Sequence, residues 1–249
     1  MIASGSKGNS TYIESNNTRL LIDVGIPFTR IKDTLDSIGV DPNTLDGILI
    51  THTHADHIGG LASLLKKIDI PVFIKEELYL EIKKIVKPDN IVIIEEDKTI
   101  IGDFDIEIIN GSHDVPAFGF VISDSKSKIL YLTDTGYINR KHYSKLKNLD
   151  AYIIESNHDE RMLMDGPYPY ILKQRVISDK GHLSNRYTGR FLNSSIGDKT
   201  KVIVLAHISE NNNTEELAVE QVKDELKDNE YQPIIVIAKQ HTDTEMVEI

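Results

Sequence analysis

The sequence predicts an α/β protein in which two mixed sheets pack together with helices on the outside, in one domain of residues 1–249. Two observations predict this class. Short runs rich in β-branched residues recur along the chain, and several intervening segments have the apolar spacing of amphipathic helices. The order of these segments is neither a regular strand–helix alternation nor a succession of strands alone, which favours mixed sheets.

The predicted strands are short runs in which Ile, Val, Leu and aromatic residues dominate. They are residues 19–24, 47–51, 71–74, 91–94, 104–109, 118–122, 128–134, 151–155, 201–206 and 234–238.

Helices are predicted where apolar residues recur three or four positions apart. Residues 29–38 and 57–67 follow this spacing. Residues 214–227 are expected to begin at a capping box, with Asn213 as the cap and Glu216 three residues further on. The segment 159–178 is predicted to be the least regular part of the chain.

Composition excludes several classes of protein. The formal net charge of −11 and a pI of about 5.3 argue against long nucleic acid as a partner, and we find no run of Lys and Arg that suggests a basic patch. Without cysteine, disulfides and thiolate catalysis are excluded. The apolar stretches have strand length, well short of the roughly 18 residues of a membrane span. We therefore expect a cytoplasmic protein with no membrane partner.

The segment THTHADHIGG, residues 51–60, is the strongest chemical signal. His52 and His54 follow an apolar run, and alternate residues of an extended segment point to the same side. Asp56 and His57 then turn into the predicted helix. Two clusters of ligands from one loop indicate two neighbouring metal positions. The alternative is a polar loop with Asp56 as a helix cap, which does not require three histidines.

Three more residues with ligand side chains follow apolar runs. His113 comes after residues 104–109, Asp134 ends 128–134, and His207 follows 201–206. A sheet edge presents such side chains to a shared cleft. Each alone also fits a turn aspartate or a surface histidine.

HTHADH with His113, LTDTGY and AHIS resembles the metallo-β-lactamase superfamily of hydrolases. The order and spacing of five motifs match over essentially the whole chain. The resemblance implies an αββα four-layer sandwich with a dinuclear site at one edge. It also implies that Asp23 in LLIDVG braces the metal loop without binding metal.

Carried over residue by residue, the resemblance places one ion on His52, His54 and His113. The second ion would take Asp56, His57 and His207, with Asp134 as the bridge. Two Zn²⁺ are expected because histidine-rich sites with a bridging carboxylate suit zinc, and Mn²⁺ is the alternative. Two such metals would activate water and polarise an acyl or phosphoryl oxygen, with Asp56 counted among the catalytic groups.

Glu155 in ESNHD and His182 in KGHLSN narrow the reaction. In the branch that includes the tRNA 3′-processing ribonucleases, a Glu and a His in this order form a relay. The resemblance implies that His182 protonates the leaving oxygen or steadies the scissile phosphate, and that the Glu155 carboxylate orients His182. A nucleotide alkoxide is a poor leaving group, so a general acid has a purpose there. The alternative is that neither residue is catalytic, with His182 as an N-terminal helix residue and Glu155 as a surface acid.

The motifs SGSKGNSTYIE, ESNHDERML and AHISENNNTEELA resemble the YycJ/WalJ group. That group holds bacterial 5′–3′ DNA exonucleases and phage anti-Pycsar phosphodiesterases of 3′,5′-cyclic nucleotides. We favour hydrolysis of a small cyclic nucleotide, in a host cytoplasm if the chain is phage-encoded, because the acidic balance suits a small anion. Residues 4–10 are candidate phosphate donors. The alternatives are an exonuclease and a non-catalytic binding protein, and the resemblance implies a homodimer.

Overall fold

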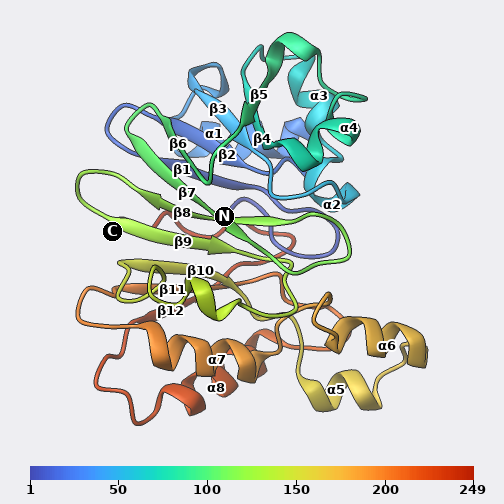
Figure 1. The fold of residues 1–249 in the computed structure, drawn as a ribbon, viewed down its shortest axis with the longest axis vertical. Coiled ribbons are helices and arrows are strands. Elements are labelled where there is room, and N and C mark those ends of the chain that lie inside the picture. Colours follow the sequence, from blue (N-terminus) through green and yellow to red (C-terminus); the bar gives the residue numbers. More distant parts are fainter. The chain divides into compact units, whose positions relative to one another are not determined.

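The computed structural model describes residues 1–249 and divides them into two compact units. The first unit comprises Met1–Ile108 and Lys239–Met246, and the second comprises Ile109–Ala238 and Val247–Ile249. Each unit contains β-strands and helices (Figure 1). The expectation of a single domain over 1–249 stays a prediction.

The first unit contains a five-stranded mixed sheet in the order β1-β2-β3-β4-β5. Strand β1 pairs with β2 antiparallel, and the remaining neighbours are parallel. The strands are β1 (Thr11–Glu14), β2 (Arg19–Ile22), β3 (Gly47–Leu49), β4 (Val72–Lys75) and β5 (Ile91–Ile94). An antiparallel pair follows, formed by β6 (Lys98–Ile101) and β7 (Phe104–Asn110), and the chain passes along β7 into the second unit.

The helices of the first unit are short. They are α1 (Phe28–Ser37), α2 (Ala55–Ile58), α3 (Leu61–Leu65) and α4 (Tyr79–Ile82). The helix predicted over 57–67 is therefore two helices separated at Gly59 and Gly60. A Cβ on Gly60 would lie 1.9 Å from the carbonyl oxygen of Ile26, so the chain approaches closely there and only glycine fits.

The second unit contains strands in the order β12-β11-β10-β9-β8, of which β9 to β12 run parallel and β8 pairs antiparallel with β9. The strands are β8 (Phe118–Ser123), β9 (Lys128–Leu132), β10 (Ala151–Glu155), β11 (Val202–Ala206) and β12 (Ile234–Ile237). The helices are α5 (Glu160–Asp165), α6 (Tyr170–Ile177), α7 (Asn185–Ser195) and α8 (Glu215–Leu226).

The core of the second unit lies between its sheet and the pair α7 and α8. Leu132, Tyr152 and Leu205 of the strands are fully or almost fully buried, as are Phe191 of α7 and Val222 of α8. The sheet is covered by these helices in Figure 1. This packing fixes the strand ends that carry the polar residues described below.

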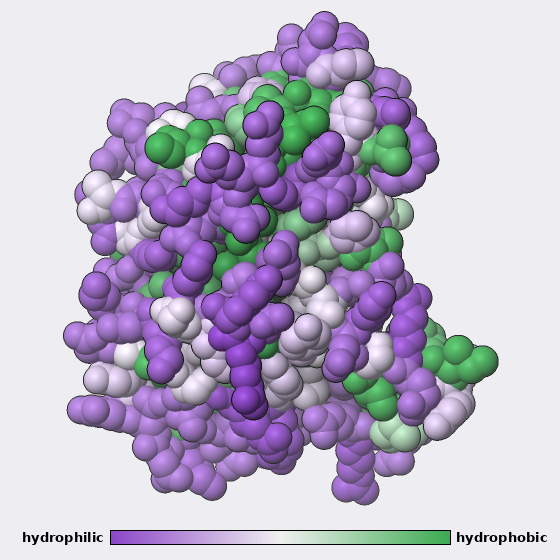
Figure 2. Space-filling view, in the orientation of Figure 1, coloured by the Kyte–Doolittle hydropathy of each residue, from purple (hydrophilic) through white to green (hydrophobic).

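Several sequence expectations about elements are corrected. The segment 159–178 is not irregular, because α5 and α6 form there, and their exposed Met164, Tyr170 and Ile171 hid the helical pattern. Figure 2 shows hydrophobic surface at the lower right, where Figure 1 places these two helices. The cap of α8 is Thr214, whose Oγ1 accepts from the Leu217 amide at 3.1 Å, and not Asn213.

All ten predicted strands are confirmed, five of them with shorter bounds. The two four-residue strands β1 and β6 were not predicted. No helix combines the length and the apolar character that crossing a bilayer requires.

Candidate metal centre and general acid

The first group of ligand side chains lies in the first unit, on the segment that leaves β3 and enters α2. The His52 ring centroid lies 4.8 Å from that of His54 and 3.9 Å from that of His57. Nε2 of His57 lies 3.5 Å from Oδ2 of Asp56. His52 and His57 are fully buried. One short segment therefore gathers three imidazoles and a carboxylate.

Asp23 holds this segment from the neighbouring parallel strand β2. Its Oδ1 accepts from the Thr51 amide at 2.8 Å, and its Oδ2 accepts from Thr51 Oγ1 at 2.7 Å. Oδ2 also lies 2.7 Å from Nδ1 of His57. Burial raises the pKa of Asp23, although the opposite charge and hydrogen bond of His57 act against this shift. Because Nδ1 of His57 is used by Asp23, this ring would bind a metal through Nε2.

Asn9 is a site residue that the sequence reasoning missed. Its Nδ2 lies 2.9 Å from Nε2 of His57 and 3.3 Å from Oδ2 of Asp56, and its backbone amide donates to the Asp56 carbonyl at 2.7 Å. Gly25 permits this approach, because a Cβ there would lie 1.7 Å from the Asp56 carbonyl oxygen. Only glycine therefore fits at position 25.

Six of the seven amides in the loop 4–10, all except that of Ser6, are not free as a phosphate cradle would require. Its amides donate to the backbone or side chains of the protein itself, as for Gly5 to Asn9 Oδ1 at 2.8 Å. Such bonds occupy Ser4, Gly5, Lys7, Gly8, Asn9 and Ser10. The Ser10 hydroxyl donates to the Asp23 carbonyl at 2.9 Å. The loop therefore supports the segment that carries His57 and Asp56.

The second group lies in the second unit, at the carboxyl ends of three adjacent parallel strands. Asp134 follows β9, Glu155 ends β10 and His207 follows β11. Parallel strands end at the same sheet edge, which is why residues so far apart in sequence meet. Asp134 Oδ1 lies 3.4 Å from Nδ1 of His207. All three side chains are almost completely buried.

Three residues in these two groups have left-handed backbone conformations that non-glycine residues rarely adopt. The φ angles are +60° at Asp23, +55° at Asp134 and +55° at His207. The only other non-glycine residue of this kind is Asn148. Backbone strain of this kind concentrates at functional sites, where the surrounding structure holds it in place.

Glu155 is the centre of the second group. Its Oε1 lies 2.8 Å from Nδ1 of both His182 and His207. Its Oε2 accepts from the amides of Thr135 and Leu183, each at 3.1 Å. Burial acts to raise the pKa of Glu155, but the charge of His182 and the hydrogen bonds of both histidines outweigh it and lower the pKa to about 2. Glu155 is therefore a carboxylate at neutral pH.

His182 lies two residues before Ser184, the cap of α7, rather than at the start of a helix. Its Nδ1 faces Glu155, so Nε2 is the nitrogen left for a substrate or a metal. Asp134 Oδ1 is 3.7 Å from the same Nδ1. The side chain is 19% exposed, in contrast to the buried Glu155. A partly open imidazole held by a buried carboxylate is the arrangement of a general acid.

His113, which follows β7, also joins the second group. Its ring centroid is 5.2 Å from that of His182, and its Nδ1 lies 3.2 Å from the Gly181 carbonyl oxygen. Burial lowers the pKa of His113, which favours the neutral ring that binds metal. His158 is also buried, with a pKa lowered by burial to about 4, so it is neutral at physiological pH.

The donor set fits divalent metal ions. The donor atoms of Asp134, Glu155, His182 and His207 lie within 4.8 Å of one another. Imidazole and carboxylate donors suit zinc and manganese, and no thiolate competes because the chain has no cysteine. Within each unit the structure brings together the predicted ligands that the unit carries. The assignment of all seven to two ions stays a prediction.

A family model described as the Metallo-beta-lactamase superfamily matches residues 3–207. The exodeoxyribonuclease WalJ of Streptococcus pneumoniae serotype 2 is 41% identical over 226 residues, which cover 88% of this chain and 84% of that protein. The exodeoxyribonuclease YycJ of Bacillus anthracis is 35% identical over 234 residues, which cover 90% of this chain and 88% of that protein. The anti-Pycsar protein Apyc1 of Bacillus phage 010DV004 is 56% identical over only 54 residues, or 21% and 20% of the two chains.

Solved structures confirm the fold. The metallo-beta-lactamase fold protein YhfI from Bacillus subtilis superposes with a TM-score of 0.73 at 18% identity, covering 96% of this chain and 93% of that one. The short form of human tRNase Z has a TM-score of 0.61 at 18% identity, with 84% and 92% covered. At these identities the likeness concerns the fold alone, and it confirms the predicted fold class.

Proposed function

The chain belongs to the metallo-beta-lactamase superfamily of metal-dependent hydrolases, and on that premise we propose that it is an exonuclease that hydrolyses the phosphodiester bonds of DNA. The observation that carries the proposal is the contact of 2.8 Å between His182 and the buried carboxylate of Glu155. This pair supplies a general acid for a poor alkoxide leaving group, which thioester hydrolysis does not require because a thiolate leaves readily.

The relatives support DNA as the substrate. The sequence alone had favoured a cyclic nucleotide. The two exodeoxyribonucleases match over most of both chains, whereas the anti-Pycsar protein matches over about a fifth. The loop 4–10, which was expected to bind a small phosphate, uses six of its seven amides within the protein. The exonuclease alternative is therefore the better supported of the two.

We propose His52, His54, Asp56, His57, His113, Asp134 and His207 as the metal ligands. Two bound divalent ions would supply Lewis acidity at the phosphoryl group and a nucleophile from water at neutral pH. Asp23 contributes by fixing the ring of His57 through its hydrogen bond at 2.7 Å. Glu155 likewise fixes the ring of His207, whose Nδ1 lies 2.8 Å from Oε1 of Glu155.

The role proposed for His182 follows from its surroundings. When both ring nitrogens of His182 carry protons, Nδ1–H faces the Glu155 carboxylate at 2.8 Å. The proton on Nε2 is then directed away from Glu155 and can pass to the leaving oxygen of the scissile phosphodiester. After this transfer the neutral ring recovers a proton from solvent, because the side chain is partly exposed. Glu155 itself stays ionised throughout.

The second candidate is the hydrolysis of 3′,5′-cyclic nucleotides. It rests on the local identity to the anti-Pycsar protein and on the acidic net charge of −11, which suits a small anion. The same seven ligands and the same acid would serve both reactions. The two candidates therefore differ in what binds around the scissile phosphate.

One assay tests the proposal. Purified protein is supplied with zinc or manganese and offered linear duplex DNA and 3′,5′-cyclic nucleotides in parallel reactions. We expect release of nucleotides from the DNA, with binding that weakens steeply as salt increases because phosphate contacts release counterions. Closed circular DNA is the control, since it has no ends. Hydrolysis of the cyclic nucleotides with intact linear DNA overturns the exonuclease proposal in favour of the second candidate.

A further inference from the structure

A basic run stands out in this acidic chain. Residues 140–147 read RKHYSKLK and contain Arg140, Lys141, Lys145 and Lys147, while no Asp or Glu occurs between Asp134 and Asp150. The expectation that the sequence has no basic run was therefore wrong at this place. Arg140, Lys141, Lys145 and Lys147 are all exposed. A local positive charge of this size can bind phosphates despite the net charge of −11.

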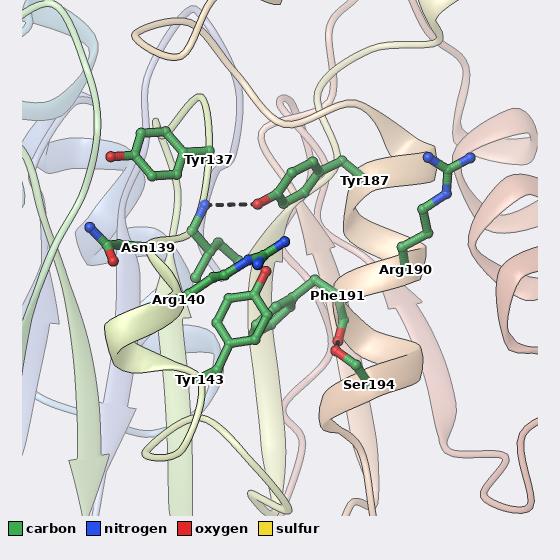
Figure 3. Close-up of a pocket in the computed structure, with 9 residues that line it drawn as sticks. Tyr137, Asn139, Arg140, Tyr143, Tyr187, Arg190, Phe191 and Ser194 are labelled. Atoms are coloured by element: carbon green, nitrogen blue, oxygen red, sulfur yellow. Dashed lines mark hydrogen bonds between the residues drawn. The ribbon is translucent and has the colours of Figure 1, made fainter.

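A cavity of about 590 Å³ lies beside this run. Its aromatic lining comes from two segments, residues 137–143 and helix α7 (Figure 3). Figure 3 shows the guanidinium of Arg140 among the rings of three tyrosines. The aromatic residues of the lining are Tyr137, Tyr143, Tyr187 and Phe191. Aromatic rings next to a guanidinium are the combination that binds bases and phosphates of single strands.

Internal contacts hold the cavity in shape. Tyr187 Oη accepts from the Ile138 amide at 3.2 Å, which joins α7 to the other segment. The rings of Tyr143 and Phe191 pack edge to face, with centroids 5.5 Å apart and planes at 74°. Burial and the hydrogen bond with Tyr187 raise the pKa of Tyr143 to about 12, so its hydroxyl stays neutral. The cavity is therefore preformed.

The two arginines of the cavity differ in their partners. Nε of Arg190 lies 3.4 Å from Oε1 of Glu225, and its side chain points away from the tyrosines in Figure 3. Arg140 forms no ion pair, so its charge is available to a ligand. This contrast provides a matched pair of arginines for a test.

The cavity is tied to the general acid through Thr135. The Thr135 amide donates to Glu155 Oε2 at 3.1 Å, and its hydroxyl donates to the Tyr137 carbonyl at 2.8 Å. Tyr137 lies three residues after Asp134, so their Cα atoms are at most about 11 Å apart. A strand whose scissile phosphate lies at His182 would reach Tyr137 within a few nucleotides.

We propose that this cavity binds a single-stranded segment of DNA next to the scissile phosphate, with a base stacked on Tyr137 and a phosphate held by Arg140. The inference rests on the proposed exonuclease function and specifies its substrate further. Stacking tolerates every base, so the cavity would hold a DNA end without selecting its sequence. It also explains how an acidic protein grips a polymer, because the attraction is local.

Binding of a labelled oligothymidylate of about ten nucleotides tests the proposal, a length within the range of single-strand sites. Fluorescence anisotropy is measured with metal-loaded protein in the His182→Ala background, which slows cleavage of the probe. We expect Tyr137→Ala to weaken binding about tenfold, as for the loss of one stacked base. Tyr137→Phe keeps the ring and is expected to bind like its parent. Thermal unfolding of each variant controls for folding.

The arginines supply the second readout. Arg140→Ala is expected to lower the affinity and to flatten the slope of log affinity against log salt by about 0.7, the contribution of one phosphate contact on a single strand. Arg190→Ala should bind like the parent, because the Arg190 guanidinium pairs with Glu225 and its side chain points away from the tyrosines. Equal losses in both arginine variants would show general charge attraction and overturn the proposal, as would unchanged binding in Tyr137→Ala and Arg140→Ala.

Failure of the proposed function has a different signature. If the wild-type protein leaves linear DNA intact while the oligonucleotide binds through Tyr137 and Arg140, the cavity is a DNA site and the exonuclease proposal is wrong. If linear DNA is degraded while the Tyr137 and Arg140 variants bind normally, the exonuclease proposal stands and the cavity assignment is wrong.

Discussion

Glu155 holds His182 through a contact of 2.8 Å between Oε1 and Nδ1, and the same oxygen lies 2.8 Å from Nδ1 of His207. One buried carboxylate thus orients both the proposed general acid and a proposed metal ligand. Loss of the acid and loss of the carboxylate should therefore have different consequences. The first two predictions use this difference.

His182→Ala is expected to lower DNA turnover by about 10²- to 10⁴-fold, the usual contribution of a positioned general acid. The metal content should stay at the wild-type level, because His182 is not among the proposed ligands. Turnover and metal analysis of the same preparation provide the measurement. Loss of metal together with activity would identify His182 as a ligand and contradict its assignment.

Glu155→Gln should lower turnover and also weaken metal binding by about 10- to 100-fold, the effect usual for partners that orient ligands. The amide cannot accept from both histidines while also accepting from the Thr135 and Leu183 amides. Metal affinity is measured by competition with a chelator. Glu220→Gln on the exposed side of α8 is the matched control and should match the wild type. Wild-type metal affinity in Glu155→Gln would show that Glu155 serves His182 alone.

Asp134→Ala should reduce both metal content and activity, because its carboxylate is the proposed bridge. Alanine at a φ of +55° also adds backbone strain of about 1–2 kcal/mol. Asp134→Asn avoids most of this strain, since asparagine tolerates the left-handed region. Elemental analysis measures the metal content of each variant. Loss of metal in both variants supports a ligand role for Asp134. Loss in the alanine variant alone would indicate a purely structural residue.

Asp23→Ala should destabilise the protein by about 3–5 kcal/mol, as expected when one partner of a buried, charged hydrogen-bond network is removed. The Thr51 amide, the Thr51 hydroxyl and Nδ1 of His57 would lose their acceptor. Urea unfolding measures the change. Asp46→Ala, at an exposed carboxylate that accepts from the Arg19 amide at 2.8 Å, is the control and should cost far less.

Tyr152 should make stability depend on pH in the alkaline range. Burial raises its pKa to about 12, and its hydroxyl donates to the Leu146 carbonyl at 2.7 Å. Because the folded pKa exceeds the unfolded value of 10, the contribution is complete below pH 10 and is lost as pH rises towards 12. The stability advantage of the wild type over Tyr152→Phe should fall by about 1.4 kcal/mol per pH unit above 10. A constant advantage in urea unfolding at several pH values would contradict this.

The site residues differ in how readily the sequence reveals them. His52, His54, Asp56 and His57 lie within six positions, so their motif is local and visible. Asn9 was missed because its role depends on a loop contacting α2, 47 residues away in the chain. The charge total concealed the basic run 140–147, because a net charge averages over the whole surface.

The sequence by itself determined the α/β class, ten of the twelve strands and the family motifs, because these depend on local periodicity and on the spacing of a few residue types. Only the tertiary structure decided that Glu155 serves two histidines, because β11 lies beside β10 and is followed by His207, while the Leu183 amide donates to Glu155 Oε2 and holds the loop of His182 there. The split of the helix at Gly59 and Gly60, the occupied amides of the loop 4–10 and the aromatic cavity beside Arg140 are likewise products of contacts between distant segments. No local pattern encodes such contacts, since each needs a partner that the fold supplies.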